Sequence, residues 1–395
     1  MPILNRPILD RITDFHPEMT AWRHDLHQHP ELALKEFRTS QVVQDHLRSF
    51  GVDEVHAGLA GTGVVGVIRG HGPGGSIGLR ADMDALPIME ETGAPYASQT
   101  PGVMHACGHD GHTTMLLGAA KYLAETRNFA GTVHVIFQPA EENLGGGKLM
   151  VDQGLFTQFP MDQVYGMHNW PALPEGEFYW RDGPVMAAVA DIEITVTGRG
   201  AHGAQPHMGV DPVVVSAAIV QALQSIVARS MRPTEAGVVT IGSIQGGHIY
   251  NVIPETVRML GTARWFTPSV GDTLEAGVHR LATHVATAFG ATADVVFRRT
   301  YPATVNDPEA MVLARRAAAS VQGETRVKHM DAPTMGGEDF SFMLNVKQGA
   351  YIMLGARRTP DDAGVHHPKY DFNDDVLPIG ASYWATLAEQ LLPRS

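Results

Sequence analysis

The order of predicted strands and helices changes near residue 187 and again near residue 300, and this order restricts the possible folds strongly. Before residue 187, apolar strands alternate with helices, which is typical of an α/β domain with a mainly parallel central sheet. Between 187 and 300 the pattern is β-α-β-β-α-β, which is typical of a ferredoxin-like domain. After residue 300 the α/β pattern resumes. We therefore expect a discontinuous α/β domain, 1–186 and 301–395, with a ferredoxin-like α+β domain, 187–300, inserted into it.

The elements of the α/β domain follow from apolar runs and from the Gly and Pro residues that interrupt them. The first 50 residues predict helix, punctuated at Pro17 and Pro30. Two short apolar runs, Val64–Ile68 and Ile77–Ala81, are separated by a glycine-rich stretch and predict a pair of neighbouring strands. The other expected elements are helix His112–Ala124, strand Thr132–Gln138, helix Pro308–Val321, strand Ala350–Leu354 and a terminal helix near Pro378–Leu392.

The elements of the inserted domain follow from the same patterns. They are strand Asp191–Thr197, helix Asp211–Arg229, strand Val238–Ile244, strand Thr256–Phe266, helix Thr273–Phe289 and strand Ala293–Arg299.

Composition excludes several classes of protein. Of the 395 residues 44% are hydrophobic, which is enough for a large core and argues against a disordered chain. The net charge of −13 argues against nucleic acid or an anionic membrane surface as the main partner. Prolines and charges interrupt the N-terminal residues 1–7, and no run of 18 uninterrupted apolar residues occurs, so we expect a cytoplasmic protein. One cysteine excludes an internal disulfide, and 20 histidines suggest metal or proton chemistry.

Side chains that can bind metal follow predicted strands or lie in loops. They are Cys107, His109, Glu141, Glu142, His168, His366 and His367. Because the carboxyl ends of the strands of an α/β sheet face a common crevice, loops far apart in the sequence can meet there. Thiolate, imidazole and carboxylate together suit zinc and its transition-metal neighbours, whereas calcium requires none of the sulfur or nitrogen ligands.

Each of these residues also has an ordinary structural explanation. Cys107 alone could be a small buried hydrophobic residue, and His168 alone a hydrogen-bonding residue at a strand end. The pair Glu141 and Glu142 could be a solvated turn, but it follows an apolar strand, where adjacent carboxylates repel unless a cation holds them. One of two such carboxylates can bind a metal while the other acts as general base on a metal-activated water, which is the chemistry of metal-assisted amide hydrolysis.

Seven motifs, in order over nearly the whole chain, resemble those of the metal-dependent amidohydrolases that include hippurate hydrolase, N-acyl-amino-acid hydrolase and indole-acetyl-amino-acid hydrolase. They are Arg23-x-x-Leu26-His27-x-x-Pro30-Glu31-Leu32, Arg80-Ala81-Asp82-Met83-Asp84-Ala85-Leu86-Pro87, His105-Ala106-Cys107-Gly108-His109-Asp110-Gly111-His112, Gln138-Pro139-Ala140-Glu141-Glu142, Gly166-Met167-His168-Asn169-Trp170-Pro171, Gly198-x-Gly200-Ala201-His202-Gly203-Ala204-x-Pro206-His207 and Asn251-Val252-Ile253-Pro254.

The resemblance implies a site for two divalent metal ions, with zinc or manganese expected and cobalt or nickel also compatible. Its ligands would be Cys107 as the bridge between the metals, His109, Glu142, His168 and His366. Glu141 would be the general base, and Asp84 would orient a ligand. The wider clan has a ligand histidine where this chain has Asp82, and we expect His109 to replace it. In the late motif His366 is the expected ligand, with His367 as the alternative.

In the inserted domain the resemblance implies residues that contact substrate. His202 would reach the active site of a neighbouring subunit and polarise the scissile carbonyl, so the enzyme would be at least a dimer. Asn251 and Arg264 would hold the carboxylate or carbonyl of the substrate. Alternatively, Asn251 caps a turn before Pro254, and Arg264 lies on an exposed strand face. The loop 336–340 also matches the family and is expected to line the pocket.

We therefore expect metal-dependent hydrolysis of the amide bond of N-acyl amino acids, with a homodimer or homotetramer as the assembly and with no nucleic-acid or membrane partner. One alternative is a dipeptidase or a deacetylase of a larger N-acetylated amino-acid derivative. A further alternative is a non-catalytic metal-binding protein of the same fold. The sequence leaves the preferred acyl group and amino acid open.

Overall fold

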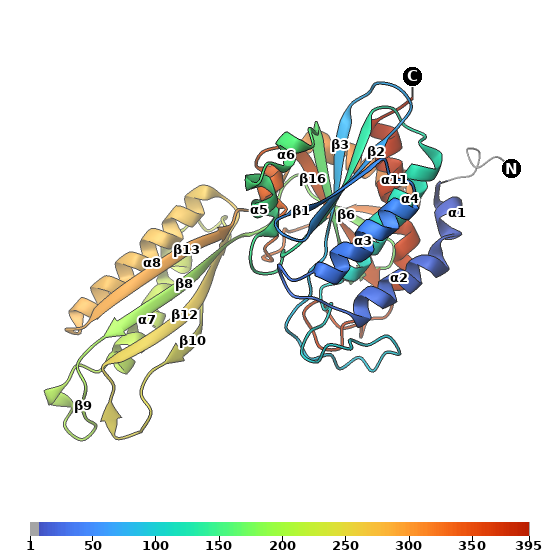
Figure 1. Cartoon of the computed structure of the whole chain (residues 1–395). Helices are drawn as coiled ribbons and strands as arrows, with labels where there is room; N and C mark the ends of the chain where they lie inside the picture. Colours follow the sequence, from blue (N-terminus) through green and yellow to red (C-terminus); the bar gives the residue numbers. More distant parts are fainter. Residues whose placement is uncertain (1–7, 395) are drawn as a thin grey trace. The chain divides into compact units, whose positions relative to one another are not determined.

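The computed structural model describes residues 8–394, which form two compact units (Figure 1). The first, called here the α/β unit, extends to Val185 and also contains Val305–Pro333 and the residues from Glu338 onward. The second, called the α+β unit, contains Met186–Thr304 and Thr334–Gly337. The boundaries between the units differ by a few residues from those predicted from the sequence. In addition, the short segment Thr334–Gly337, which was predicted to be part of the α/β domain, belongs to the α+β unit.

The α/β unit contains an eight-stranded sheet in the order β1-β2-β4-β3-β5-β16-β6-β15. Its strands are β1 (Glu54–Leu59), β2 (Gly63–Arg69), β3 (Ser76–Asp82), β4 (Thr132–Gln138), β5 (Gln163–Pro174), β6 (Phe178–Trp180), β15 (Val327–His329) and β16 (Gln348–Arg357). The central strands β4, β3, β5 and β16 are parallel to their neighbours in this group, so their carboxyl ends lie at one edge. Two further strands, β7 (Gly183–Met186) and β14 (Thr304–Asn306), pair with each other.

The expected pairing of the runs Val64–Ile68 and Ile77–Ala81 is wrong, because β4 lies between β2 and β3. The glycine-rich loop between the two strands crosses the start of β4 and does not close a hairpin. Its backbone bonds to the segment before β4 and to the first residue of β4: His71 N donates to Phe129 O at 2.7 Å, and Thr132 N donates to Gly75 O at 3.0 Å. The two strands therefore flank β4.

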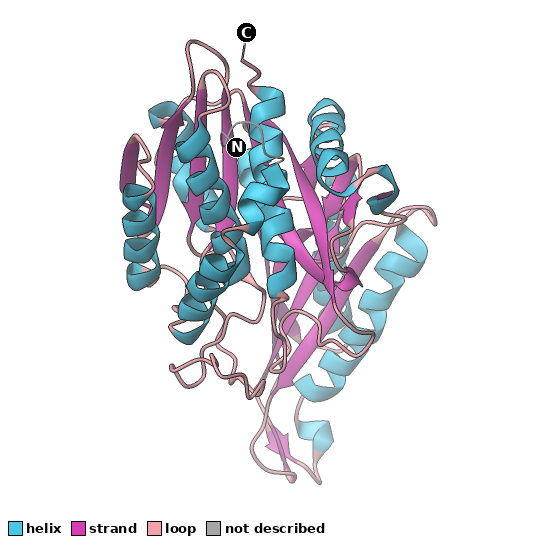
Figure 2. Ribbon diagram, turned by 90° about the vertical axis from the view of Figure 1, so that its right-hand side faces the viewer, coloured by secondary structure: helices cyan, strands magenta, loops and turns pink. Residues whose placement is uncertain are grey.

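Helices run alongside the strands of the large sheet (Figure 2). They are α1 (Ile8–Thr13), α2 (His16–Gln28), α3 (Phe37–Ser49), α4 (His109–Thr126), α5 (Gly146–Asp152), α6 (Leu155–Gln158), α9 (Pro308–Gln322), α10 (Ser341–Leu344) and α11 (Leu377–Leu391). A single core joins α1, α2, α4, α9 and α11 to one face of the sheet, and β3 contributes alternate residues such as Leu79 to it. Arg80 and Asp82 point from β3 to the opposite face because side chains alternate along a strand.

Helix α4 begins directly at a predicted metal ligand, His109, because the preceding residue is a glycine. Gly108 has a φ of +91°, in the left-handed region that favours glycine. A Cβ atom there would lie 2.5 Å from Asn169 Nδ2 and 2.6 Å from Tyr370 Oη. The close approach of two other segments and the backbone conformation therefore both require glycine at this position.

The α+β unit contains a four-stranded antiparallel sheet in the order β10-β12-β8-β13. Its main elements are β8 (Ala188–Thr197), α7 (Pro212–Ser225), β10 (Gly237–Gln245), β12 (Thr256–Trp265), α8 (Pro268–Ala288) and β13 (Thr292–Tyr301), and the short strands β9 (Ala201–His202) and β11 (Val252–Ile253) form a separate ladder. The element order and strand order are those of the predicted ferredoxin-like arrangement. Both helices pack against the sheet through a second core that includes Ile194, Ile219 and Leu274.

One helix among the described residues, Pro212–Ser230, is long and apolar enough by length and composition to cross a membrane. Such a helix is weak evidence for a membrane span, because core helices have the same composition. Here Val215, Ile219, Leu223 and Ile226 of this helix are fully or almost fully buried in the core of the α+β unit.

Candidate metal centre

The carboxyl ends of β3, β4 and β5 bring the predicted metal ligands of the α/β unit together. Among the described residues, five groups of side chains have potential ligand atoms that all lie within 4.8 Å of one another, and three of these groups consist of predicted site residues. They are Cys107 with His109 and His168, Cys107 with Glu142 and His366, and His109 with Glu141 and Glu142. Because the groups share members, all five predicted ligands and the predicted base form one cluster.

Two histidines of the cluster are oriented by hydrogen bonds from their Nδ1 atoms. His109 Nδ1 donates to the backbone oxygen of Asp84 at 2.9 Å, and His168 Nδ1 donates to the backbone oxygen of Asn169. The Nε2 atom of each ring is therefore the one that faces the cluster. His168 Nε2 lies 3.4 Å from Cys107 Sγ, and His109 Nε2 lies 3.9 Å from Glu142 Oε1. With the Nδ1 atoms engaged in this way, Nε2 is the nitrogen of each ring that is free to bind a metal ion once the ring is neutral.

The carboxylate of Asp84 holds the backbone of the two glutamates. Glu141 N and Glu142 N each donate to one Asp84 oxygen at 3.0 Å. The preceding residue, Ala140, is buried and has a φ of +56°, which is an unfavourable conformation for a residue with a Cβ atom. Ala140 N is fixed in turn by Glu36 Oε1 at 3.0 Å. The surrounding hydrogen bonds thus enforce a strained turn that directs both glutamates to the cluster.

The donor set of the cluster fits divalent cations. Among residues 8–394, His109 Nε2 and Glu142 Oε1 are buried and have no hydrogen-bond partner. Burial raises the pKa of the Cys107 thiol well above its usual range, and Glu142 and Glu141 add to this effect. Burial, together with Glu338 and Glu142, likewise raises the pKa of Glu141. Bound cations would compensate these charges and bind the two atoms that have no hydrogen bond, and the mixed S, N and O donors suit zinc and its neighbours.

The structure brings His366 into this cluster, whereas the adjacent His367 makes a different contact. His366 Nε2 lies 3.2 Å from Glu142 Oε1, and His366 N donates to Ala106 O at 2.7 Å. Its φ of +65° is in the left-handed region, which is unfavourable for a residue with a Cβ atom. His367 Nδ1 accepts from Lys369 N at 3.0 Å and belongs to none of the potential ligand groups in the described part of the chain.

Sequence reasoning missed a buried charge network behind the cluster, centred on Arg80. The guanidinium is fully buried and forms ion pairs with Asp82 at 2.7 Å, Glu338 at 2.9 Å and Asp339 at 3.0 Å. Asp82 occupies the position where the wider clan has a ligand histidine, but here its carboxylate is engaged by Arg80 and by His112 Nδ1, the latter at 2.6 Å. Burial alone would raise the pKa of Asp82, but His109, His112 and Arg80 hold that pKa well below its usual range. The sequence contained one signal for this network, namely the two opposite charges Arg80 and Asp82 in the otherwise uncharged strand β3.

The three predicted residues of the inserted domain lie at two separate places within the α+β unit. His202 is on β9, which pairs with β11 directly after Asn251, and Gly203 N donates to Asn251 O at 2.7 Å. Arg264 lies near the opposite end of β12 and is half-buried, with no carboxylate within ion-pair distance among the described residues. The structure therefore brings His202 and Asn251 together but not Arg264.

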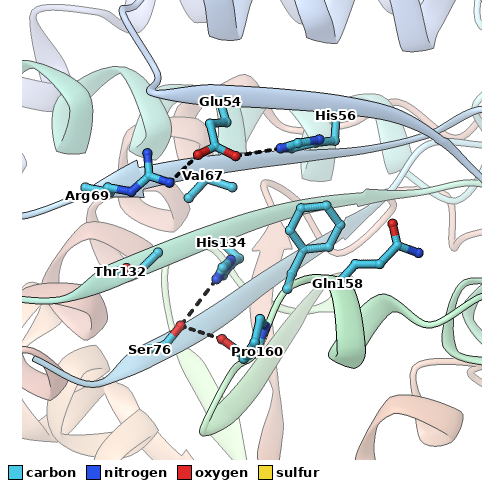
Figure 3. Close-up of a pocket in the computed structure, with 10 residues that line it drawn as sticks. Glu54, His56, Val67, Arg69, Ser76, Thr132, His134, Gln158 and Pro160 are labelled. Carbon is cyan, nitrogen blue, oxygen red and sulfur yellow. Dashed lines mark hydrogen bonds and ion pairs between the residues drawn. The ribbon is translucent and has the colours of Figure 1, made fainter.

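A pocket of the α/β unit lies at the opposite end of strands β3 and β4 from the metal-ligand cluster (Figure 3). Its volume is about 540 Å³. The polar side chains that line it bond mainly to one another: Ser76 Oγ donates to Pro160 O and contacts His134 Nε2, and Glu54 pairs with Arg69 (Figure 3). We call this region the amino-end pocket.

Comparison with known proteins identifies the family of this chain. Residues 78–390 match peptidase family M20/M25/M40. A hippurate hydrolase from Campylobacter jejuni is 40% identical over 385 residues, which cover 98% of this chain and 99% of the relative. Thermostable carboxypeptidase 1 from Saccharolobus solfataricus is 39% identical and covers 96% of this chain and 98% of the relative. The solved structure of the Bacillus subtilis YXEP protein, described as a dinuclear metal binding peptidase from the M20 family, is 33% identical, with a TM-score of 0.82 and coverage of 96% and 99%.

These findings confirm the predicted family, fold class and enzyme class. The chain belongs to peptidase family M20/M25/M40 and is a metal-dependent amidohydrolase.

Proposed function

We propose that the protein hydrolyses the amide bond of N-acyl amino acids, with a carboxylate and a free amino acid as products. The observation that carries this proposal is the buried pair Glu141 and Glu142, which Asp84 fixes by two backbone hydrogen bonds beside the cluster of Cys107 and three histidines. The pair provides one carboxylate for metal binding and one for proton transfer, and amide hydrolysis needs both functions.

Two divalent ions would be held by the five clustered ligands. Cys107 would bridge the ions, and the remaining ligands would be His109, Glu142, His168 and His366. Zinc or manganese suits this set, and cobalt or nickel is also compatible. When bound, the ions supply Lewis acidity that polarises a carbonyl and lowers the pKa of water.

Glu141 is the residue proposed to move the proton. It is buried, and Asp339 N donates to its Oε1 atom at 3.4 Å, which restricts its orientation. As general base, Glu141 takes a proton from the attacking water and passes it to the departing amine. Both transfers use the same carboxylate, so the side chain must remain close to water and to the leaving nitrogen throughout.

The separation of the α+β residues supports a homodimer or a homotetramer. Thr256 and Arg264 are eight residues apart on β12, and an extended strand of that length spans roughly 26 Å. One small substrate cannot contact both the Asn251 side of this sheet and Arg264 within one subunit. We propose that His202 acts in the site of a neighbouring subunit with Asn251 beside it, and that Arg264 binds the carboxylate of a different substrate molecule. Arg264 fits a carboxylate-binding role because its guanidinium is half-buried and, among residues 8–394, has no carboxylate within ion-pair distance.

The substitution Glu141→Gln tests the proposed reaction. The amide keeps the shape of the side chain but cannot accept a proton, so we expect turnover to fall by at least about 10³-fold with two metal ions still bound per subunit. Turnover would be measured on chelated protein reloaded with zinc, manganese, cobalt or nickel, and metal content by elemental analysis. Glu54→Gln, in the amino-end pocket, is the control and should retain activity. Near-normal turnover of Glu141→Gln would exclude the proposed base.

A carboxypeptidase or dipeptidase activity is the second candidate, and the 39% identity to a thermostable carboxypeptidase favours it over more distant reactions. The substrate panel separates the two candidates. N-acetyl, N-benzoyl and longer N-acyl amino acids would be compared with dipeptides and with larger N-acetylated amino-acid derivatives at equal concentration. Preference for dipeptides by kcat/KM would replace the first proposal by the second.

A further inference from the structure

His112 lies one turn after His109 on α4 and is buried, and with Asp82 and His109 it forms a further group of potential ligands. Both of its ring nitrogens, however, have partners within the protein. Nδ1 lies 2.6 Å from Asp82 Oδ1. Nε2 lies 3.0 Å from Asn169 N and 2.9 Å from Asn169 Nδ2. No ring nitrogen of His112 is left to bind a metal in this arrangement.

The partners also determine which nitrogen carries the proton. The backbone N–H of Asn169 can only donate, so His112 Nε2 must accept and is unprotonated. The proton is therefore on Nδ1, which donates to the carboxylate of Asp82. The other oxygen of Asp82 accepts from Arg80 Nη1 at 2.7 Å, so the acceptor itself is held in place. The neutral Nδ1–H form of His112 is the form that satisfies both neighbours.

Asn169 extends this contact to the other ligand-bearing segments. It directly follows the predicted ligand His168 at the end of β5, and its Nδ2 atom donates to the backbone oxygen of Cys107 at 2.8 Å. Its Oδ1 atom accepts from Tyr370 Oη at 2.6 Å. Tyr370 N donates to His367 O, so Tyr370 belongs to the turn that follows His366. All the side chains of this network are buried.

We propose that His112 is a positioning residue for the metal centre and not one of its ligands. His112 holds Asn169, and Asn169 in turn fixes the relative positions of the loop that contains Cys107, the end of β5 at His168 and the turn after His366. The atom of His112 that holds Asn169 is Nε2, which accepts its hydrogen bonds. This inference rests on the metal site proposed above. Residues in this outer position typically change metal affinity by about 10–100-fold while the number of bound ions stays the same.

Two substitutions distinguish the roles of the two ring nitrogens of His112. In His112→Asn the amide nitrogen can take the place of Nδ1 and donate to Asp82, but the acceptor for Asn169 is lost. In His112→Gln the longer side chain can place its amide oxygen near the position of Nε2 and accept from Asn169, but the donor to Asp82 is lost. The proposal predicts a larger loss of metal affinity for His112→Asn, about 10–100-fold, than for His112→Gln.

The experiment uses full-length, metal-loaded protein. Each variant would be titrated with a competing chelator, and the zinc or manganese that remains bound would be counted per subunit. Wild-type protein that holds fewer than two ions at saturation would contradict the proposed metal site, independently of His112. If the wild type holds two ions, three results would overturn the positioning role: one ion in both variants at saturation, unchanged affinity in His112→Asn, or equal losses in both variants.

Tyr370→Phe provides a milder variant, in case the substitutions at His112 prevent folding. It removes only the hydroxyl that donates to Asn169 Oδ1 and retains the buried ring. We expect about a threefold loss of metal affinity, and a loss in the double variant with His112→Asn that is smaller than the product of the two single effects. Unchanged affinity in Tyr370→Phe, or fully independent effects in the double variant, would contradict the network.

Discussion

The two edges of the large sheet, at opposite ends of β3 and β4, use similar charged residues in different environments. At the carboxyl edge Arg80 and its three carboxylate partners are almost completely buried. At the other edge Arg69 and Glu54 form one ion pair with about half of each side chain exposed. The buried charges are fixed by several partners each, whereas the exposed pair competes with water. A catalytic centre needs fixed charges, and only the carboxyl edge provides them.

Replacing the two arginines is the strongest test of this comparison. Arg80→Met leaves the carboxylates of Asp82, Glu338 and Asp339 buried without their counter-charge, and we expect a loss of about 3–5 kcal/mol in the free energy of unfolding. Arg69→Met should change stability little, because its partner Glu54 is solvated. Urea unfolding of both variants in the presence of chelator would measure this difference. Equal losses would show that burial does not distinguish the two edges.

Two aspartates allow the same comparison for catalysis. Asp84 accepts the backbone N–H groups of Glu141 and Glu142, and Asp162 accepts the backbone N–H of Ser76 at 2.8 Å at the other edge. Asp84→Asn replaces one acceptor by an NH₂ group that opposes a backbone N–H, and we expect kcat/KM to fall about 100-fold, which is about 2.7 kcal/mol. Asp162→Asn should retain the activity of the wild type. A similar loss in both variants would indicate a general effect on folding.

Two buried histidines should give opposite pH dependences of stability. Burial alone would lower the pKa of His27, but hydrogen bonds to Asp110 and Glu90 raise it to about 9. Its contribution is therefore complete below about pH 6.5 and is lost as the pH rises through about 9. Burial, aided by Arg69, lowers the pKa of His134 in the amino-end pocket to about 4. The folded state favours the neutral form of this ring, so the free energy of unfolding falls as the pH drops from about 6.5 toward 4.

The variants His27→Gln and His134→Gln would measure these two effects, each expected to be about 1–2 kcal/mol. Relative to the wild type, the deficit of His27→Gln should shrink between pH 6.5 and 9. The relative stability of His134→Gln should improve between pH 6.5 and 4.5. Parallel pH profiles for the two variants would contradict the assigned environments.

Elements with strong periodicity could be predicted from the sequence, but their neighbours could not. The strand Thr132–Gln138 is correct to the residue, because a short β-branched run is bounded clearly on both sides. The position of that strand between β2 and β3 was not predicted, because it depends on where the chain rejoins the sheet after α4. Likewise, residues 8–50 form three helices. The interruption at Pro30 was predicted, but the length of the break at residues 29–36 depends on tertiary contacts such as that of Glu36 with Thr62.

The candidate site shows the same limit. Residues that bind metal have distinctive types, so Cys107 and His109 could be nominated from their motif. Arg80 and His112 could not be assigned a role, because their contacts join segments up to 259 positions apart, such as Arg80 and Asp339. The conformation of His366, which separates it from His367, is likewise a property of the folded backbone.

The interrupted course of the chain through the α/β unit has a consequence for biosynthesis. Strand β16 pairs with β5 in the middle of the large sheet, although the whole α+β unit is translated between them. The α+β unit has a contiguous core from β8 to β13 and can fold as soon as it leaves the ribosome. The large sheet must wait with an open edge at β5, and His366 is translated after β16. The nascent enzyme therefore lacks the last of its proposed ligands until His366 has been translated, which delays tight metal capture until after β16 has been made.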